Sequence, residues 1–193
     1  LENPPWLKPG SLPVSQPMHH FYMAQSYAAS LSRNRALKEV EEAHRLEPKN
    51  PKFHLLKMRL LLEQDRSTDG AKEAFAALES GKEYIPEVLA MSDEFYLPEA
   101  QAVYRKTIEM GNKDVLPYLG LGNIALHGGN LPEAEKWFVQ ARELQAEHPA
   151  VLLAWGRLTA TKAQRLTDEA QAKKQLQEAR VLLEKAKAKG EES

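Results

Sequence analysis

Histidine is the side chain of this sequence that could most readily do acid–base or metal chemistry near neutral pH. The six histidines are His19, His20, His44, His54, His127 and His148. His19 and His20 are adjacent, so on a helix they diverge and do not share a face. No two histidines have the His-x3-His spacing of a helical metal site. The sequence therefore predicts no metal site.

Nucleophilic and phosphate-binding motifs are also missing from the sequence. The chain has no cysteine, which excludes thiolate catalysis, disulfide bonds and zinc–thiolate sites. Gly128-Gly129 follows His127, but phosphate-binding loops need more glycines and a lysine. We therefore interpret the glycine pair as a turn. With no catalytic constellation, we expect no enzyme activity, no catalytic residues and no cofactor.

The composition favours a folded helical chain. Strong helix formers such as Ala, Leu, Glu and Lys dominate, whereas Val and Ile are sparse. The net charge of −1 provides no strong basic field, so we expect no nucleic-acid partner. No apolar run approaches the roughly 18 residues that a membrane helix needs. We therefore expect no direct membrane insertion by this chain.

The first residue is Leu1 rather than Met, so we interpret the chain as a fragment or a processed protein. A signal or membrane anchor upstream would then lie outside it. A chain without cysteine suits the cytoplasm and the periplasm equally, so the location stays open. Residues 1–17 contain five prolines and are predicted to form an extended segment or linker. Alternatively, Trp6 anchors this segment on the rest of the chain.

Two identical tetrapeptides mark an internal repeat. Leu-Pro-Glu-Ala occurs at residues 97–100 and again at 131–134, 34 residues further on. A fixed period of this size predicts an array of stacked supersecondary units. The stretch around the second copy reads Tyr118-x2-Leu121-Gly122-x2-Ala125 and then Ala134-x3-Phe138-x2-Ala141. This pattern closely resembles the tetratricopeptide repeat (TPR), a pair of antiparallel helices.

The resemblance implies an all-α fold, an α-solenoid whose helix pairs form a right-handed superhelix. We expect about five TPR-like units, at residues 18–50, 51–81, 82–113, 114–147 and 148–188. Residues 189–193 follow as a frayed tail, because the end of the chain has no apolar residue larger than Ala. The last helix is expected to cap the array.

The repeats depart from a constant period at defined places. The second helix of the first unit matches through Ala36-x3-Val40-x2-Ala43, and that of the second unit through Ala71-x3-Phe75 with Leu78. The third unit is shorter, and Pro86 is predicted to open a helix that runs to about Tyr96. In the fifth unit, four extra residues are expected around 163–168.

The resemblance also implies a concave groove lined by the first helices of the units. Counting from the large residue of each first helix, the groove positions are Phe21, Gln25, Leu56, Leu60, Ile85, Leu89, Leu119, Asn123, His127, Leu153 and Arg157. Most are apolar, which favours an amphipathic helix or a hydrophobic peptide over a carboxylate tail. Asn123, His127 and Arg157 would orient the ligand. Alternatively, the register of the second and third units is offset by one, and their leucines are core.

The sequence thus predicts a non-catalytic scaffold that binds a protein or peptide partner, with homo-oligomerisation possible. One alternative is a regulatory or positioning TPR domain of a larger, possibly membrane-anchored, enzyme or assembly. A less favoured alternative is an RNA-binding array of helix pairs, against which the near-neutral charge and the Leu-Gly signature argue.

Overall fold

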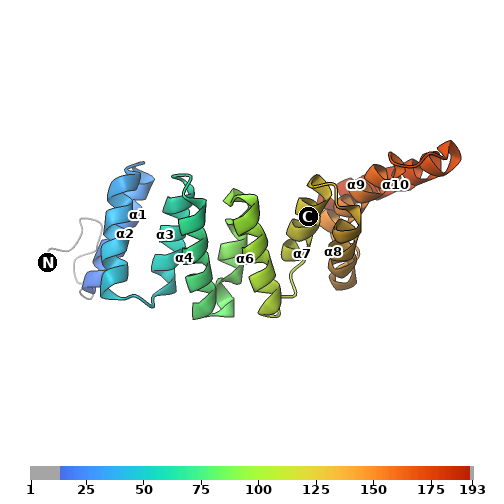
Figure 1. The fold of residues 1–193 in the computed structure, drawn as a ribbon. Coiled ribbons are helices and arrows are strands. Elements are labelled where there is room, and N and C mark those ends of the chain that lie inside the picture. The colour runs from blue at the N-terminus through green and yellow to red at the C-terminus, as the bar shows by residue number, and fades with distance from the viewer. Residues whose placement is uncertain (1–13, 192–193) are drawn as a thin grey trace. The chain divides into compact units, whose positions relative to one another are not determined.

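The structure, a computed structural model, describes residues 14–191 (Figure 1). Within this range every regular element is a helix, which confirms the predicted all-α fold. The helices are α1 (Gln16–Ala29), α2 (Arg33–Leu46), α3 (Pro51–Leu62), α4 (Ser67–Ser80), α5 (Ile85–Ala90), α6 (Leu97–Glu109), α7 (Leu116–His127), α8 (Leu131–Leu144), α9 (Pro149–Ala163) and α10 (Glu169–Glu191). Two short 3-10 helices, η1 (Lys82–Tyr84) and η2 (Ser92–Glu94), flank α5.

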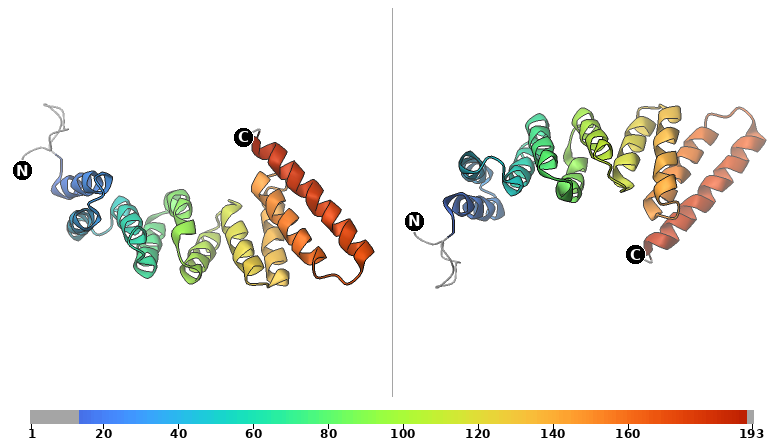
Figure 2. Two further views of the ribbon diagram at one scale, coloured as in Figure 1. Left: turned by 90° about the horizontal axis from the view of Figure 1, so that it is seen from above. Right: turned by 90° about the horizontal axis from the view of Figure 1, so that it is seen from below.

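Consecutive helices pack as pairs. The pairs α1–α2, α3–α4, α7–α8 and α9–α10 make the most extensive helix–helix contacts in the described part of the chain. Figure 2 shows α9 and α10 side by side and antiparallel. The chain divides into two compact units, residues 1–103 and 104–193, and the boundary falls within α6. The array of TPR-like helix pairs is therefore present as predicted.

Proline and side-chain caps define where the helices begin. Proline occupies the first turn of α1, α3, α5, α7, α8 and α9, where the backbone amide needs no partner. The Asn50 side chain accepts a hydrogen bond from Lys52 N, and Asn130 accepts one from Glu133 N. His148 caps α9 in the same way through Ala150 N. Because Pro17 is tolerated in a first turn, α1 begins at Gln16, slightly before the predicted boundary.

The first two pairs follow a constant period of 34 residues. The buried set of α2 is Ala36, Leu37, Val40 and Ala43, and the residues 34 positions later on α4, Gly70, Ala71, Ala74 and Ala77, are also buried. The predicted match at Ala71-x3-Phe75 is therefore one residue out of register, and Phe75 is only half-buried. A Cβ at Gly70 would lie 3.1 Å from Leu62 Cδ2, so a small residue is needed there.

The third pair is shortened at its first helix. Ile85–Ala90 is the whole of α5, so the predicted helix running to about Tyr96 is wrong. After Ala90 the chain forms η2 and then an extended residue, Phe95, whose side chain is buried. The equivalent small residues Gly70 and Ala100 are 30 positions apart, four fewer than the regular period. The pair has lost about one helical turn.

In the second unit, two glycines allow close helix crossings. A Cβ at Gly122 of α7 would overlap the ring of Phe138 on α8, which is fully buried. A Cβ at Gly156 of α9 would lie 2.7 Å from Leu183 Cδ2 on α10. These two contacts are the crossings that the Leu-Gly signature predicts. They explain why α7 and α9 pack tightly on their second helices.

The last pair contains the predicted insertion. Helix α9 ends at Ala163 and α10 begins at Glu169, so the extra residues form the turn between them. The frayed tail predicted at 189–193 is not seen in its described part, because α10 continues to Glu191. Lys189 Nζ lies 3.2 Å from Glu147 Oε2 and ties this last turn to the loop after α8. Residues 192–193, and residues 1–13 with Trp6, lie outside the described residues.

Candidate functional site

The first unit has an open depression on its first helices. The depression has a volume of about 190 Å³. Its lining consists of Phe21 and Gln25 from α1, Lys52, Leu55, Leu56 and Arg59 from α3, Glu87 from α5, and Met91, which follows α5. We call these eight residues the first-helix depression. Four of them are apolar and four are polar or charged, so it joins an apolar surface to a charged border.

The 34-residue period determines which side chains of α3 reach the depression. His20 Nδ1 lies 2.7 Å from Glu39 Oε2, and one period later His54 Nδ1 lies 2.7 Å from Glu73 Oε2. Each bridge joins the first helix of a pair to its second helix. Positions 31 and 65, in the turns between the helices, repeat as well, since both backbones are left-handed. The equivalents of Phe21 and Gln25 are therefore Leu55 and Arg59.

This register decides where the predicted groove residues of the first unit lie. Phe21, Gln25 and Leu56 line the depression together. Leu60, Ile85 and Leu89 do not line it, and Leu60 has no exposed surface at all. Lys52, Leu55, Arg59, Glu87 and Met91 were missed by the sequence analysis. The repeated His–Glu spacing was the signal that could have identified Leu55 and Arg59.

In the second unit, the predicted residues lie on α7 and α9. Leu119 is buried and belongs to the core with Val115 and Phe138. Asn123 is half-buried and His127 is exposed, one turn apart on α7. On α9, Leu153 is 37% exposed and Arg157 is exposed, again one turn apart. Since α7 and α9 contact each other, four of the five predicted residues are at least partly accessible on neighbouring helices.

The charges at the border of the first-helix depression have no partners in the described part of the chain. Lys52, Arg59 and Glu87 are all exposed and form no ion pair or hydrogen bond through their side chains there. By contrast, Lys57 of the same helix α3 lies 2.8 Å from Glu73 Oε1 and is half-buried. The border charges are therefore available to a ligand, whereas Lys57 belongs to the internal packing.

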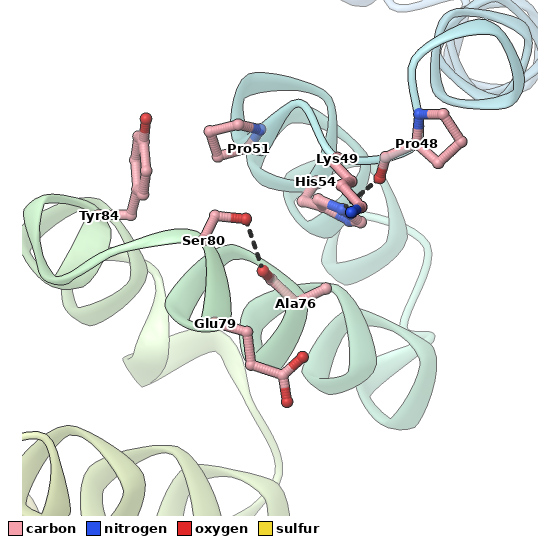
Figure 3. Close-up of a pocket in the computed structure, with 8 residues that line it drawn as sticks. All are labelled: Pro48, Lys49, Pro51, His54, Ala76, Glu79, Ser80 and Tyr84. Atoms are coloured by element: carbon pink, nitrogen blue, oxygen red, sulfur yellow. Dashed lines mark hydrogen bonds between the residues drawn. The ribbon is translucent and has the colours of Figure 1, made fainter.

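A second, larger depression of about 570 Å³ lies at the ends of α3 and α4 (Figure 3). Pro48, Pro51, His54, Ser80 and Tyr84 are among its lining residues. Its polar side chains are largely used internally, because His54 Nε2 lies 3.1 Å from Pro48 O and Ser80 Oγ donates to Ala76 O. We therefore place the candidate binding site at the first-helix depression instead.

A buried polar cluster joins α2, α3 and α4 behind this surface. The rings of His44 and His54 meet edge to face with centroids 4.7 Å apart. Burial raises the pKa of the Glu73 carboxyl, but hydrogen bonds from His54 and Lys57 outweigh burial and hold it below its ordinary value. Burial, followed by the neighbouring His54, lowers the pKa of His44. The cluster has the contacts of a structural link between helices.

Metal and membrane sites were searched for in the same residues. The described residues contain no group of three or more His, Cys, Asp or Glu side chains that could hold a metal ion. Among the helices of residues 14–191, none combines the length and the apolarity needed to cross a membrane.

Comparisons with known proteins identify the fold. No protein-family model and no curated protein sequence matches the chain. Among solved structures, a MamA protein aligns over 91% of this chain and 92% of its own, with 11% identity and a TM-score of 0.63. PilF of Pseudomonas aeruginosa aligns over 89% and 76%, with 13% identity and a TM-score of 0.57. YrrB, described as a TPR protein with an unusual peptide-binding site, aligns over 90% and 91%, with 16% identity and a TM-score of 0.54.

Proposed function

We propose that this chain, which has the fold of the tetratricopeptide-repeat proteins, is a non-catalytic scaffold that binds a segment of a partner protein through its first helices. The observation that carries the proposal is the first-helix depression, where Phe21, Leu55 and Met91 from three successive segments provide an apolar surface. Apolar side chains left open between helices are suited to anchoring the apolar face of a helix or peptide.

Two further observations support the proposal. The border of the depression carries charges that have no partner in residues 14–191, and such groups can fix the orientation of a ligand. YrrB, a structural neighbour, is described as having a peptide-binding site. In the second unit, Asn123, His127, Leu153 and Arg157 are the residues that we expect to contact the same partner.

The proposal can be tested by capture from a native lysate with paired variants. Leu55→Glu places a charge in the depression, and Leu55 is half-buried, so the helix pair can accommodate the change. Val181→Glu is the matched control, because Val181 is 54% exposed on α10 and outside the depression. We expect proteins bound by the wild-type chain to be lost with Leu55→Glu and retained with Val181→Glu. An identical set of captured proteins for both variants would contradict the proposal.

A further inference from the structure

The size of the first-helix depression limits what it can hold. Small-molecule sites usually enclose roughly 300–1,000 Å³, whereas this depression measures about 190 Å³. Its apolar surface is made by Phe21, Leu55, Leu56 and Met91. Space of this size between apolar side chains suits one large apolar side chain projecting from a longer segment.

Two cations on α3 flank this apolar surface. Lys52 and Arg59 are seven residues apart, which is about two turns or 10 Å along the helix, and Leu55 and Leu56 lie between them in sequence. Both cations line the depression, are exposed and have no ion-pair partner among the described residues. A segment that inserts an apolar side chain between them would bring its neighbouring side chains close to both charges.

Glu87 gives the depression a second, opposite border. It comes from α5, whereas both cations come from α3. Like them, it has no ion-pair partner in residues 14–191. The border is therefore positive along α3 and negative at α5. A carboxylate of the ligand is favoured beside α3 and disfavoured beside Glu87, which gives the bound segment a preferred orientation.

From this arrangement we infer that the partner segment carries one large apolar side chain with carboxylates on both sides of it. The apolar side chain enters the first-helix depression, and the carboxylates pair with Lys52 and Arg59. This inference rests on the proposed function and specifies the partner. The charge pairs act mainly on selectivity, because each exposed pair contributes little alone, while like charges in the same places oppose binding.

The test uses three short fluorescein-labelled peptides and the full 193-residue chain. The first peptide has a central Phe between two runs of Glu. The second has the same Phe between runs of Lys, and the third has Ala between the runs of Glu. We expect fluorescence polarisation to show at least tenfold tighter binding of the first peptide than of either other peptide. Leu55→Glu should remove this binding.

Charge reversal provides the sharper arm of the test. The double variant Lys52→Glu with Arg59→Glu should prefer the Lys-flanked peptide over the Glu-flanked one. The matched control is Lys38→Glu with Lys82→Glu, which makes the same change in net charge at exposed positions outside the depression. The control should keep the wild-type preference. Thermal melting of both double variants verifies that they remain folded.

Several outcomes would overturn the inference. These are equal or tighter binding of the Lys-flanked peptide, absence of binding by every peptide, and a wild-type preference retained after charge reversal. They are distinguishable from failure of the proposed function, because that function is judged separately by partner capture with Leu55→Glu and Val181→Glu. A partner lost only with Leu55→Glu would leave the scaffold function standing even if the acidic motif were wrong.

Discussion

Gly122 illustrates how one residue determines the distance between two helices. A side chain at this position would overlap the ring of Phe138, which has no exposed surface. We expect Gly122→Ala to lower the free energy of unfolding by about 1–3 kcal/mol, because the core there has no space for a methyl group. Urea denaturation followed by circular dichroism would measure the change.

Gly128→Ala is the matched control for Gly122→Ala. Gly128 has a negative φ of −73°, and the nearest atom to an added Cβ is Ile124 O at 3.4 Å. Alanine at a compatible position restricts the unfolded chain and stabilises by about 0.4–1 kcal/mol. Equal destabilisation by both variants would show that Phe138 does not set the cost.

Leu60 and Arg59 test the register of α3 directly. They are neighbours in sequence, but Leu60 is fully buried and Arg59 is exposed in the depression. We expect Leu60→Glu to unfold the first unit, because it buries an unpaired charge, and Arg59→Glu to leave the melting temperature nearly unchanged. A chain that stays folded with Leu60→Glu would mean that Leu60 faces the groove, as the sequence register first predicted.

Glu73 and His44 make the first unit sensitive to acid. Both have pKa values lowered in the folded chain, from ordinary values of 4.5 and 6.5. The unfolded state therefore binds protons first, so stability decreases as the pH falls below about 6.5 and decreases further below about 4.5. Denaturant unfolding at a series of pH values would measure both steps.

Glu73→Gln separates the two contributions. Losing the charged hydrogen bonds from His54 and Lys57 should cost about 1–3 kcal/mol at neutral pH, and should flatten the pH dependence below 4.5. Glu79→Gln is the control, since Glu79 is exposed on the same helix. A Glu73→Gln variant with the wild-type pH dependence would assign the acid sensitivity to other groups.

At the scale of elements, the sequence predicted helix pairs better than it predicted their register. The fourth pair was placed correctly because Gly122 and Phe138 are one unmistakable contact. The second pair was shifted because Ala71 was taken as the equivalent of Ala36, whereas the structure assigns that place to Gly70. Gly and Ala satisfy the same packing requirement, so residue type alone could not distinguish them.

The end of α5 explains most of what was missed at the candidate site. Pro86 marks the start of the helix, but no Pro or Gly marks its stop after Ala90. Tertiary packing of Met91 and Phe95, both buried, ends the helix instead. Glu87 and Met91 reach the depression only because the helix is this short, so a regular count placed Ile85 and Leu89 there.

Asn130 offers a prediction about helix initiation. Its side chain accepts a hydrogen bond from Glu133 N at the start of α8. Removing an N-cap costs about 0.5–2 kcal/mol, so we expect Asn130→Ala to lower the free energy of unfolding by this amount. Asn34→Ala, an exposed change in the first turn of α2 without such a bond in the described residues, is the control. Equal effects would argue against capping.

At the scale of the whole molecule, the division into two compact units predicts how damage spreads. Phe138→Ala removes a fully buried ring and should cost about 3–5 kcal/mol. In a linear array such a loss weakens its own pair and the adjacent contacts most. We therefore expect amide hydrogen exchange to accelerate in α7, α8 and α9, while α1 to α4 keep their protection. Uniform acceleration along the chain would indicate a single cooperative unit.

The constant period of the first two pairs also bears on how such a chain could evolve its selectivity. Because α2 and α4 carry the same small buried residues 34 positions apart, duplicating one pair would give the next first helix a familiar surface to pack on. Each duplication would add one pair of groove positions, equivalent to Phe21 and Gln25 or to Leu55 and Arg59. The number of pairs would then act as a ruler for the length of partner segment that is recognised.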